Sequence, residues 1–339
     1  MSLADRVVAA WYAPRLTPLA AALWPLSVVF RSLVAVRRAL FRAGVLRSQR
    51  LPVPVVVVGN ITVGGAGKTP LTGALGEGLR QRGLHPGIVS RGHGGSAQGP
   101  RAVAPGDDAR EVGDEPLIHA AAGFPVWVGR DRVAAARGLL AANPACDVLL
   151  CDDGLQHYRL ARTVEIVVVD AARGFGNGLP LPAGPLRERE SRLATVDAVV
   201  RLVARDVPRP PAADGRATLM AYEPLPWRNL VDVAAVADPV SWRGRDIHAV
   251  AGIAHPRRFF DLLRTLGISA IEHPLPDHHA FTAADVAYPT AAAILMTQKD
   301  AVKCAGLADG RCWYLPLSAV VDPALLALVE NKIRGFQTA

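Results

Sequence analysis

The chain has 339 residues and a formal net charge of +8, from 38 lysines and arginines against 30 aspartates and glutamates. Half of the residues are apolar and a fifth are charged, which excludes wholesale disorder and indicates one large or two modest domains. The four cysteines form neither a CxxC pair nor a cluster with histidine. We therefore expect neither a disulfide framework nor a structural zinc site. We expect the protein to reside in a reducing compartment.

Positive charge gathers in the first 50 residues, which carry eight arginines and one acid, whereas the rest of the chain is nearly neutral. A nucleic-acid-binding surface on the main body is therefore not expected. Residues 16–30 form a charge-free apolar run of 15 residues, interrupted by Pro18 and Pro25. This run is shorter than the roughly 20 residues needed to span a bilayer. The arginine-rich stretch that follows it disfavours an export signal.

We therefore predict that residues 1–50 form an amphipathic segment that lies in a membrane interface. Trp11, Tyr12 and Trp24 suit the headgroup boundary, and the arginines that follow suit anionic lipid phosphates. A helix packed on the protein core with a solvated basic tail is the alternative.

The residues from 51 onward alternate between short apolar runs and helical stretches. Residues 53–58, bounded by Pro52 and Gly59, predict a strand buried on both faces. Similar runs predict further strands at 88–90, 126–128, 148–151, 166–169 and 198–202. Helices are expected at 69–82 and 130–142. This order predicts a P-loop NTPase-type α/β domain with a doubly wound, mostly parallel sheet, over residues 51–206.

A proline-rich stretch at 207–216 is the expected linker to a smaller C-terminal α/β domain at 217–339. The strands predicted in that domain lie at 248–253, 294–297 and 313–315, and the helices at 257–266 and 323–333.

A glycine-rich loop directly after the first predicted strand of the larger domain carries the strongest chemical signal. Its residues are Thr62, Val63, Gly64, Gly65, Ala66, Gly67, Lys68 and Thr69. A strand, a glycine-rich loop, Lys-Thr and a helix are the context of a phosphate-binding P-loop. Lys68 would reach the β/γ-phosphates and Thr69 would hold Mg²⁺. Thr62 stands where the usual pattern opens with glycine, and a glycine-rich turn with an incidental lysine is the alternative.

A P-loop also needs an acid near the metal. Asp152 and Asp153 follow the apolar run 148–151, so the strand end would bring at least one of them to the phosphate loop. Local sequence leaves open which one, and Asp152 could instead cap the turn before Gly154.

Candidates for the group that activates an acceptor lie elsewhere in the chain. Asp114 and Glu115 stand at a loop-to-helix transition, where Asp114 would serve either as a base or as a helix N-cap. His278 and His279 lie in a turn-like setting, and nothing local distinguishes a functional from a structural histidine there.

Eight motifs occur in order along most of the chain. They are VGNITVGGAGKTP (58–70), SRGHGG (90–95), VGDEP (112–116), VGRDR (128–132), DDGLQHYRL (152–160), LPAGPLRE (181–188), PDHHAF (276–281) and MTQKDAVK (296–303). This set resembles the tetraacyldisaccharide 4'-kinase family of lipid A synthesis. The resemblance implies a kinase at the cytoplasmic face of the bacterial inner membrane. It would use ATP and Mg²⁺ to phosphorylate the 4'-hydroxyl of an acylated glucosamine disaccharide 1-phosphate.

The resemblance also implies roles for individual residues. Asp114 would be the catalytic base, paired with His278 and with Glu115 beside them, and this pair would span the two domains. Asp153 would be the likelier metal-side acid, and Lys68 and Thr69 would keep their P-loop roles. The positions implied on the substrate side are Arg91, Gln156, His157 and Arg187.

Three positions depart from the family's usual form: Ala66 replaces a common threonine, His93 a common tyrosine and Gln298 a common glutamate. Thr297-x-Lys299-Asp300 is also similar to the base-reading loop of GTPases, although a helix cap explains Asp300 equally well. Two alternative functions remain at this point. One is a P-loop ATPase or GTPase of metallochaperone or ligase type, and the other is a nucleotide-gated membrane adaptor. No protein partner is inferred.

Overall fold

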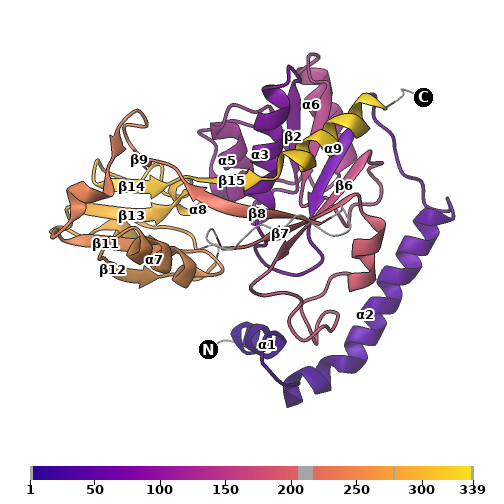
Figure 1. Cartoon of the computed structure of the whole chain (residues 1–339), viewed down its shortest axis with the longest axis horizontal. Coiled ribbons are helices and arrows are strands. Elements are labelled where there is room, and N and C mark those ends of the chain that lie inside the picture. Colours follow the sequence, from indigo (N-terminus) through magenta and orange to yellow (C-terminus); the bar gives the residue numbers. More distant parts are fainter. Residues whose placement is uncertain (1–2, 205–216, 278, 337–339) are drawn as a thin grey trace. The chain divides into compact units, whose positions relative to one another are not determined.

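The computed structural model describes residues 3–204, 217–277 and 279–336 (Figure 1). It divides into two compact units. The first unit comprises Met1–Arg91, Asp131–Ala221 and Val320–Ala339, and the second comprises Gly92–Arg130 and Tyr222–Ala319. The expected linker at 207–216 lies outside the described residues.

These units differ from the contiguous domains expected from the sequence, most of all at residues 92–130 and at the C-terminus. Residues 92–130 belong with the second unit, and the C-terminal helix α9 (Pro323–Arg334) belongs with the first. In α9, Leu326 lies where a Cβ on Gly78 of helix α3 (Lys68–Arg80) would be, and Glu330 pairs with Arg82 at 2.9 Å. Packing between distant segments therefore overrides order in the chain.

The first unit is built on a parallel sheet whose strands run in the order β8-β7-β6-β1-β5-β2. The strands are β1 (Val55–Gly59), β2 (Pro86–Ser90), β5 (Val148–Asp152), β6 (Val164–Asp170), β7 (Ala198–Leu202) and the start of β8 (Ala217–Pro224). All five residues of β1 are buried, as its run of valines predicts for a central strand. Val58 lies opposite both Asp152 and Ile166, so the carboxyl ends of β1 and β5 meet at one edge.

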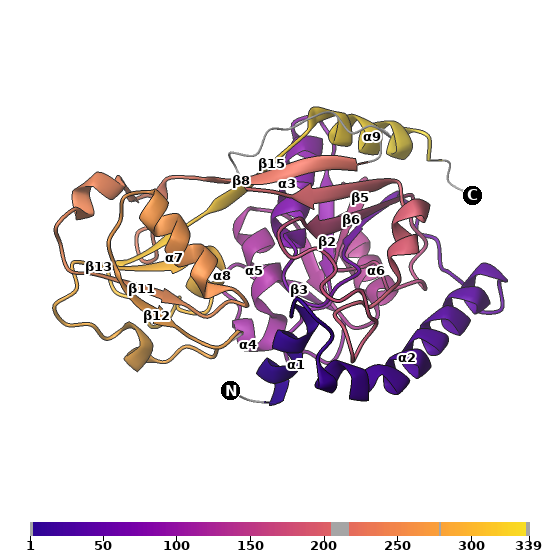
Figure 2. The same cartoon turned by 60° about the horizontal axis from the view of Figure 1, so that its bottom comes forward.

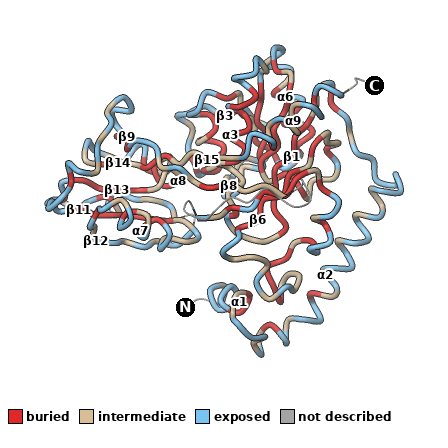
Figure 3. Tube along the Cα trace, in the orientation of Figure 1, coloured by how far each residue is buried: buried red, intermediate tan, exposed pale blue. Residues whose placement is uncertain are grey.

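Helices α3 and α6 (Arg132–Ala142) pack against this sheet. Leu71, Leu75 and Leu79 line the inner face of α3, and each is fully buried. The mostly parallel α/β architecture expected from the sequence is confirmed. Buried residues follow the strands in Figure 3, which shows where the cores lie.

The second unit holds a six-stranded mixed sheet in the order β10-β9-β14-β13-β11-β12. Its strands are β9 (Trp227–Asn229), β10 (Val236–Ala237), β11 (Ile247–Ala251), β12 (Ile271–Pro274), β13 (Ala293–Thr297) and β14 (Cys312–Leu315). The sequence predicts β11, β13 and β14 but not β9, β10 or β12. Helices α7 (Pro256–Thr265) and α8 (Gln298–Ala301) belong to this unit (Figure 2).

Residues 92–130 add to the second unit a short antiparallel pair of strands, β3 (Arg101–Val103) and β4 (Val126–Val128). The helices α4 (Ala109–Val112) and α5 (Asp114–Ala121) lie between these strands in the chain. Strand β15 (Leu317–Val321) leads from the second unit back to α9.

Two helices precede β1: α1 (Leu3–Trp11) and α2 (Pro18–Arg42). The Thr17 side chain caps α2, and Pro18 occupies its first turn, where a missing N–H costs little. The helix continues through Pro25 for 25 residues. The expectation that the apolar segment is too short to span a bilayer is therefore wrong for the helix as a whole, because its helical length extends beyond the charge-free run. By length and composition alone, α2 could cross a membrane.

Candidate functional site

The glycine-rich loop joins β1 to α3, as the sequence predicts. Gly64 and Gly67 adopt left-handed backbone angles, with φ of 101° and 93°, which a residue with a Cβ rarely adopts. Gly67 is also the N-cap of α3, so the loop ends with backbone N–H groups at a helix N-terminus. This end of a helix attracts anions.

The side chain of Asn60 stabilises the glycine-rich loop through hydrogen bonds. It is fully buried directly after β1, and its Nδ2 donates to the carbonyl oxygen of Gly64 at 3.1 Å. Its Oδ1 accepts a hydrogen bond of 3.3 Å from Nζ of Lys68. The sequence analysis quoted this asparagine only as part of a motif. A polar residue directly after a fully apolar strand is the signal that could have identified it.

The two acids at the end of β5 have different partners. Oδ2 of Asp152 accepts a hydrogen bond of 2.9 Å from the hydroxyl of Thr69. Asp153 instead lies 3.6 Å from Nζ of Lys68 and 3.2 Å from a guanidinium nitrogen of Arg187. Asp152 therefore lies on the Thr69 side, whereas the resemblance implies Asp153 as the likelier metal-side acid. Asp153 has φ of 52°, which ends the strand and redirects its side chain.

The carboxylate of Asp153 is strongly held in its ionised form. Burial opposes ionisation, but the charges of Lys68 and Arg187 outweigh burial and lower the pKa of Asp153 to about 2. Lys68, Asp153 and Arg187 thus form a compact charged group beside the loop.

Arg187 comes from a segment more than 100 residues after the loop, and backbone pairing brings the two together. The amide of Val63 donates to the carbonyl of Pro185 at 2.8 Å, and the amide of Arg187 donates to Ile61 at 2.7 Å. This pairing places Arg187 beside the phosphate loop, whereas the resemblance implied only a position on the substrate side.

Gln156 lies in the same group of residues, because its Oε1 accepts from Arg187 at 3.4 Å and its Nε2 donates to Glu188 at 2.9 Å. Glu188 is buried and also accepts a hydrogen bond of 2.5 Å from the hydroxyl of Tyr158. Glu188 thus accepts hydrogen bonds from both Gln156 and Tyr158, a structural role that the sequence analysis did not predict. Its position next to Arg187 in the LPAGPLRE motif was the available signal.

His157 is held in its neutral form. Burial, followed by the positive charge of Arg132, lowers the pKa of His157 to about 4. Arg91, the remaining expected substrate-side residue, is exposed just after β2. In this unit the structure therefore clusters Gln156 and Arg187 with the P-loop acids, and a role for Arg91 stays a prediction.

The second unit contains the other acidic pair. Asp114 begins α5 and is almost fully buried, and Glu115 follows it. Nζ of Lys299 lies 3.1 Å from Glu115, 3.7 Å from Asp114 and 3.9 Å from Asp277. Burial opposes the charge of Lys299, but these carboxylates outweigh it and raise its pKa.

His278 lies outside the described residues. Its neighbours Asp277 and His279 belong to the same unit as Asp114. The expectation that the acidic pair and the PDHHAF motif come from different domains is therefore wrong, because residues 92–130 pack with the C-terminal part of the chain. Nε2 of His279 pairs with Oδ2 of Asp285 at 3.1 Å, which indicates a structural role for that histidine.

Comparisons with known proteins all indicate the same enzyme family. The model of the family described as tetraacyldisaccharide-1-P 4'-kinase matches residues 19–334. The chain belongs to this family. It is 52% identical over 318 residues to the tetraacyldisaccharide 4'-kinase of Azoarcus sp., covering 94% of this chain and 93% of that one. It is 51% identical to the enzyme of the same name from Dechloromonas aromatica, covering 94% and 95%.

A crystal structure of a 4'-kinase, LpxK from Aquifex aeolicus in complex with ATP, has a TM-score of 0.80 with this chain at 27% identity. The match covers 93% of this chain and 99% of the other. The resemblance drawn from the motifs is therefore confirmed. The chain is a kinase, and the ATPase, GTPase and adaptor alternatives are not favoured.

Family membership gives no support to the similarity of residues 297–300 with a base-reading loop. The Thr297 side chain caps α8 by accepting from the amide of Asp300 at 3.1 Å. Asp300 is fully buried and accepts from the amide of Gly252 at 3.1 Å and from the hydroxyl of Thr297 at 2.7 Å. In this 4'-kinase, Asp300 therefore has a structural role, in which its carboxylate joins Thr297, the N-cap of α8, to the backbone of Gly252.

Proposed function

We propose that this chain transfers the γ-phosphate of ATP to the 4'-hydroxyl of a tetraacylated glucosamine disaccharide 1-phosphate. The observation that carries the proposal is the charged group at the phosphate loop, where Lys68 and Arg187 flank Asp153 and Thr69 contacts Asp152. We infer the identity of the acceptor from the relatives, which are named tetraacyldisaccharide 4'-kinase.

The oxygens near the loop suit Mg²⁺. Thr69 offers a hydroxyl and Asp152 a carboxylate, which are hard oxygen ligands, and Mg²⁺ is commonly held by one or two such groups together with substrate phosphates. Among the described residues, no group of three or more histidines, cysteines and acids is placed to hold a metal, so a cage made of protein ligands alone is not proposed. When bound, Mg²⁺ would neutralise charge on the phosphates.

The protein itself would stabilise the transferring phosphoryl group through fixed positive charges. Lys68 is held by Asn60 and Asp153, and Arg187 is held by Asp153 and Gln156. A charge that is already in place when the reaction begins does not have to be repositioned. Such preorganised electrostatic stabilisation, together with positioning, is the main source of catalysis in phosphoryl transfer. We propose that the loop amides and Lys68 bind the phosphates and that Arg187 faces the acceptor.

Asp114 would accept the proton of the sugar hydroxyl, with His278 as its partner and Glu115 beside it. The buried setting of Asp114 at the start of α5 suits a base, because few waters compete for it. Asp114 also lies in the first turn of α5, and the N-terminal end of a helix stabilises a nearby negative charge.

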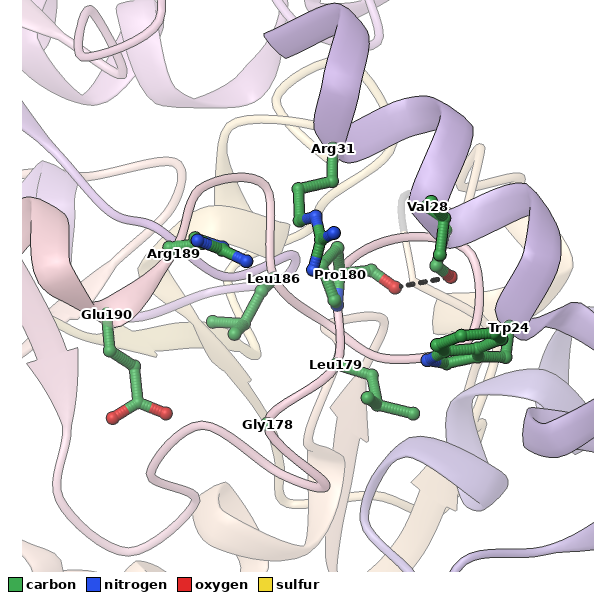
Figure 4. Close-up of a pocket in the computed structure, with 10 residues that line it drawn as sticks. Trp24, Val28, Arg31, Gly178, Leu179, Pro180, Leu186, Arg189 and Glu190 are labelled. Atoms are coloured by element: carbon green, nitrogen blue, oxygen red, sulfur yellow. Dashed lines mark hydrogen bonds between the residues drawn. The ribbon is translucent and has the colours of Figure 1, made fainter. Parts of the chain in front are cut away.

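A cavity of about 290 Å³ between α2 and residues 178–190 is the proposed entry for the lipid acceptor (Figure 4). Trp24, Val28, Leu179 and Leu186 give it apolar walls, and Arg31 and Arg189 supply positive charge beside them. Apolar walls suit an acyl chain, and guanidinium groups suit a phosphate.

We propose that α2 lies on the cytoplasmic face of the membrane and does not cross it. The hydroxyl of Ser27, in the middle of the helix, donates to the carbonyl of Pro180 at 2.9 Å and accepts from the amide of Ala183 at 2.9 Å. Crossing the bilayer would break these contacts with the folded body. One helical stripe remains exposed for the membrane: Leu26, Val29, Leu33 and Val36.

The direct test is to incubate the protein with ATP labelled on the γ-phosphate, Mg²⁺ and the acylated disaccharide 1-phosphate. We expect label on the sugar at the 4' position, together with ATP consumption that depends on the lipid. Rapid ATP hydrolysis without lipid, and no labelled sugar, would instead support the ATPase alternative.

A further inference from the structure

Lys299 is the cation on which three carboxylates of the second unit converge. Its ammonium lies 3.1 Å from Glu115, 3.7 Å from Asp114 and 3.9 Å from Asp277. These acids come from two separate segments, the start of α5 and residues 276–281. Lys299 has no part in the proposed phosphate binding or in the proposed role of Asp114 as the base.

The backbone that carries Lys299 is firmly anchored. The next residue, Asp300, is fully buried and is bonded to the amide of Gly252 and to the side chain of Thr297. Nζ of Lys303 pairs with Asp300 at 2.7 Å and donates to the carbonyl of Gly252 at 3.2 Å. Because these contacts of Asp300 and Lys303 hold the backbone of α8 in place, the Lys299 side chain extends from a fixed position.

The same short segment also contacts Asp277 and Phe281. Lys299 pairs with Asp277, and the ammonium of Lys303 lies 5.1 Å from the centre of the Phe281 ring. The ring of His279 also packs edge-on against Phe281 at 5.4 Å. Lys299 and Lys303 therefore contact Asp277 and Phe281, respectively.

We infer that Lys299 is a positioning residue that holds Asp114, Glu115 and Asp277 together for proton transfer. The inference rests on the proposed role of Asp114 as the base. It adds the cation that two adjacent acids, one of them buried, share.

The physical reason is electrostatic compensation. Glu115 beside Asp114 places two negative charges on the first turn of α5, and Asp277 adds a third from the neighbouring segment. Like charges at close range oppose ionisation, whereas a cation within about 4–6 Å favours it. Only 24% of the Lys299 side chain is exposed, so solvent screens its charge less than it would at the surface.

The test compares the variants Lys299→Met and Lys299→Arg with the control Lys332→Met in the full-length protein. Methionine keeps the apolar stem without the charge, and arginine keeps the charge. Lys332 pairs with Asp197 at 2.6 Å in the first unit, so its variant removes an ion pair from the other unit of the chain. The kcat, the KM of each substrate and the affinity for an ATP analogue are measured across pH 5–9, with Asp114→Asn in parallel.

We expect Lys299→Met to lower kcat by about tenfold or more and to move the acidic limb of the kcat/KM profile to higher pH, with unchanged affinity for the ATP analogue. Lys299→Arg should restore the position of the limb, and Lys332→Met should behave as wild type.

An unchanged acidic limb in Lys299→Met would overturn the inference, as would a loss of activity that arginine does not rescue and that comes with weaker binding of the ATP analogue. Full activity of Asp114→Asn would instead refute the proposed base. Loss of activity in Asp114→Asn together with a normal Lys299→Met would refute the inference alone.

Discussion

The hydroxyl of Thr69 donates a hydrogen bond of 2.9 Å to Oδ2 of Asp152, although 83 positions separate the two residues. Thr69 stands in the first turn of α3 and Asp152 at the last position of β5. The parallel pairing of β1 with β5 brings the ends of these elements together. A hydroxyl and a carboxylate thus meet beside the phosphate loop, where a magnesium nucleotide would bind.

Asp152→Asn should raise the Mg²⁺ concentration needed for half-maximal activity by roughly tenfold or more, because a neutral amide binds a divalent cation less strongly than a carboxylate. The measurement is the initial rate against Mg²⁺ at fixed ATP. Asp153→Asn should instead affect turnover at saturating Mg²⁺, because Asp153 holds Lys68 and Arg187. Identical Mg²⁺ curves for Asp152→Asn and wild type would contradict this assignment.

Arg187→Met should lower kcat by about 10²–10³-fold, the scale expected when one fixed charge is removed from a preorganised site. The KM for ATP should change little, because Lys68 and the loop amides would still hold the phosphates. Steady-state kinetics with each substrate varied separately distinguish the two effects. Arg189→Met is a useful comparison, since this neighbour lines the proposed acceptor cavity, and its loss should raise the KM of the lipid more than it lowers kcat.

Asp114→Asn should lower the rate of phosphoryl transfer by about 10²–10⁴-fold, the usual contribution of a positioned base, while an ATP analogue still binds. Single-turnover assays with excess enzyme measure the chemical step directly. The control is Asp108→Asn, since Asp108 is an exposed N-cap of α4 and asparagine caps a helix equally well. If Asp114→Asn turns over at the wild-type rate, another group must take the proton.

Replacing Leu26, Val29 and Leu33 on the exposed stripe of α2 with serine should weaken binding to anionic vesicles by at least tenfold. Burying one large aliphatic side chain contributes about 1.5–3 kcal/mol, so three losses are readily measured by vesicle sedimentation. The matched control replaces Val231 and Val233, which are 62% and 63% exposed in the second unit. Equal loss of binding in the control would show that α2 is not the membrane-binding element.

The stability of the first unit should depend on pH through His157. Its pKa is lowered from 6.5 to about 4 in the folded chain, mainly by burial. Unfolding therefore takes up a proton between about pH 6.5 and 4, and stability is full above this range and falls as pH decreases through it.

His157→Gln should consequently lose less stability over the same range, as measured by urea unfolding at several pH values. His85, whose side chain is 66% exposed, provides the control variant His85→Gln. Parallel curves for His157→Gln and wild type would show that His157 does not carry this pH dependence.

The sequence by itself determines the elements whose signals are local. The valine run before Gly59, the glycines at 64 and 67, and Lys68-Thr69 are contiguous, so they specify a strand, a phosphate loop and a helix without knowledge of the rest of the chain. The motifs also identify the family, because several short signatures in a fixed order seldom arise by chance.

Only the tertiary structure decides which distant side chains share a site. The choice between Asp152 and Asp153 depends on where β5 ends and on the left-handed backbone of Asp153, which no local pattern specifies. Likewise, Lys299 reaches Asp114 and Glu115 across more than 180 positions because residues 92–130 pack with the second unit. Sequence patterns encode the preferences of neighbouring residues, whereas the meeting of remote ones follows from strand order and packing.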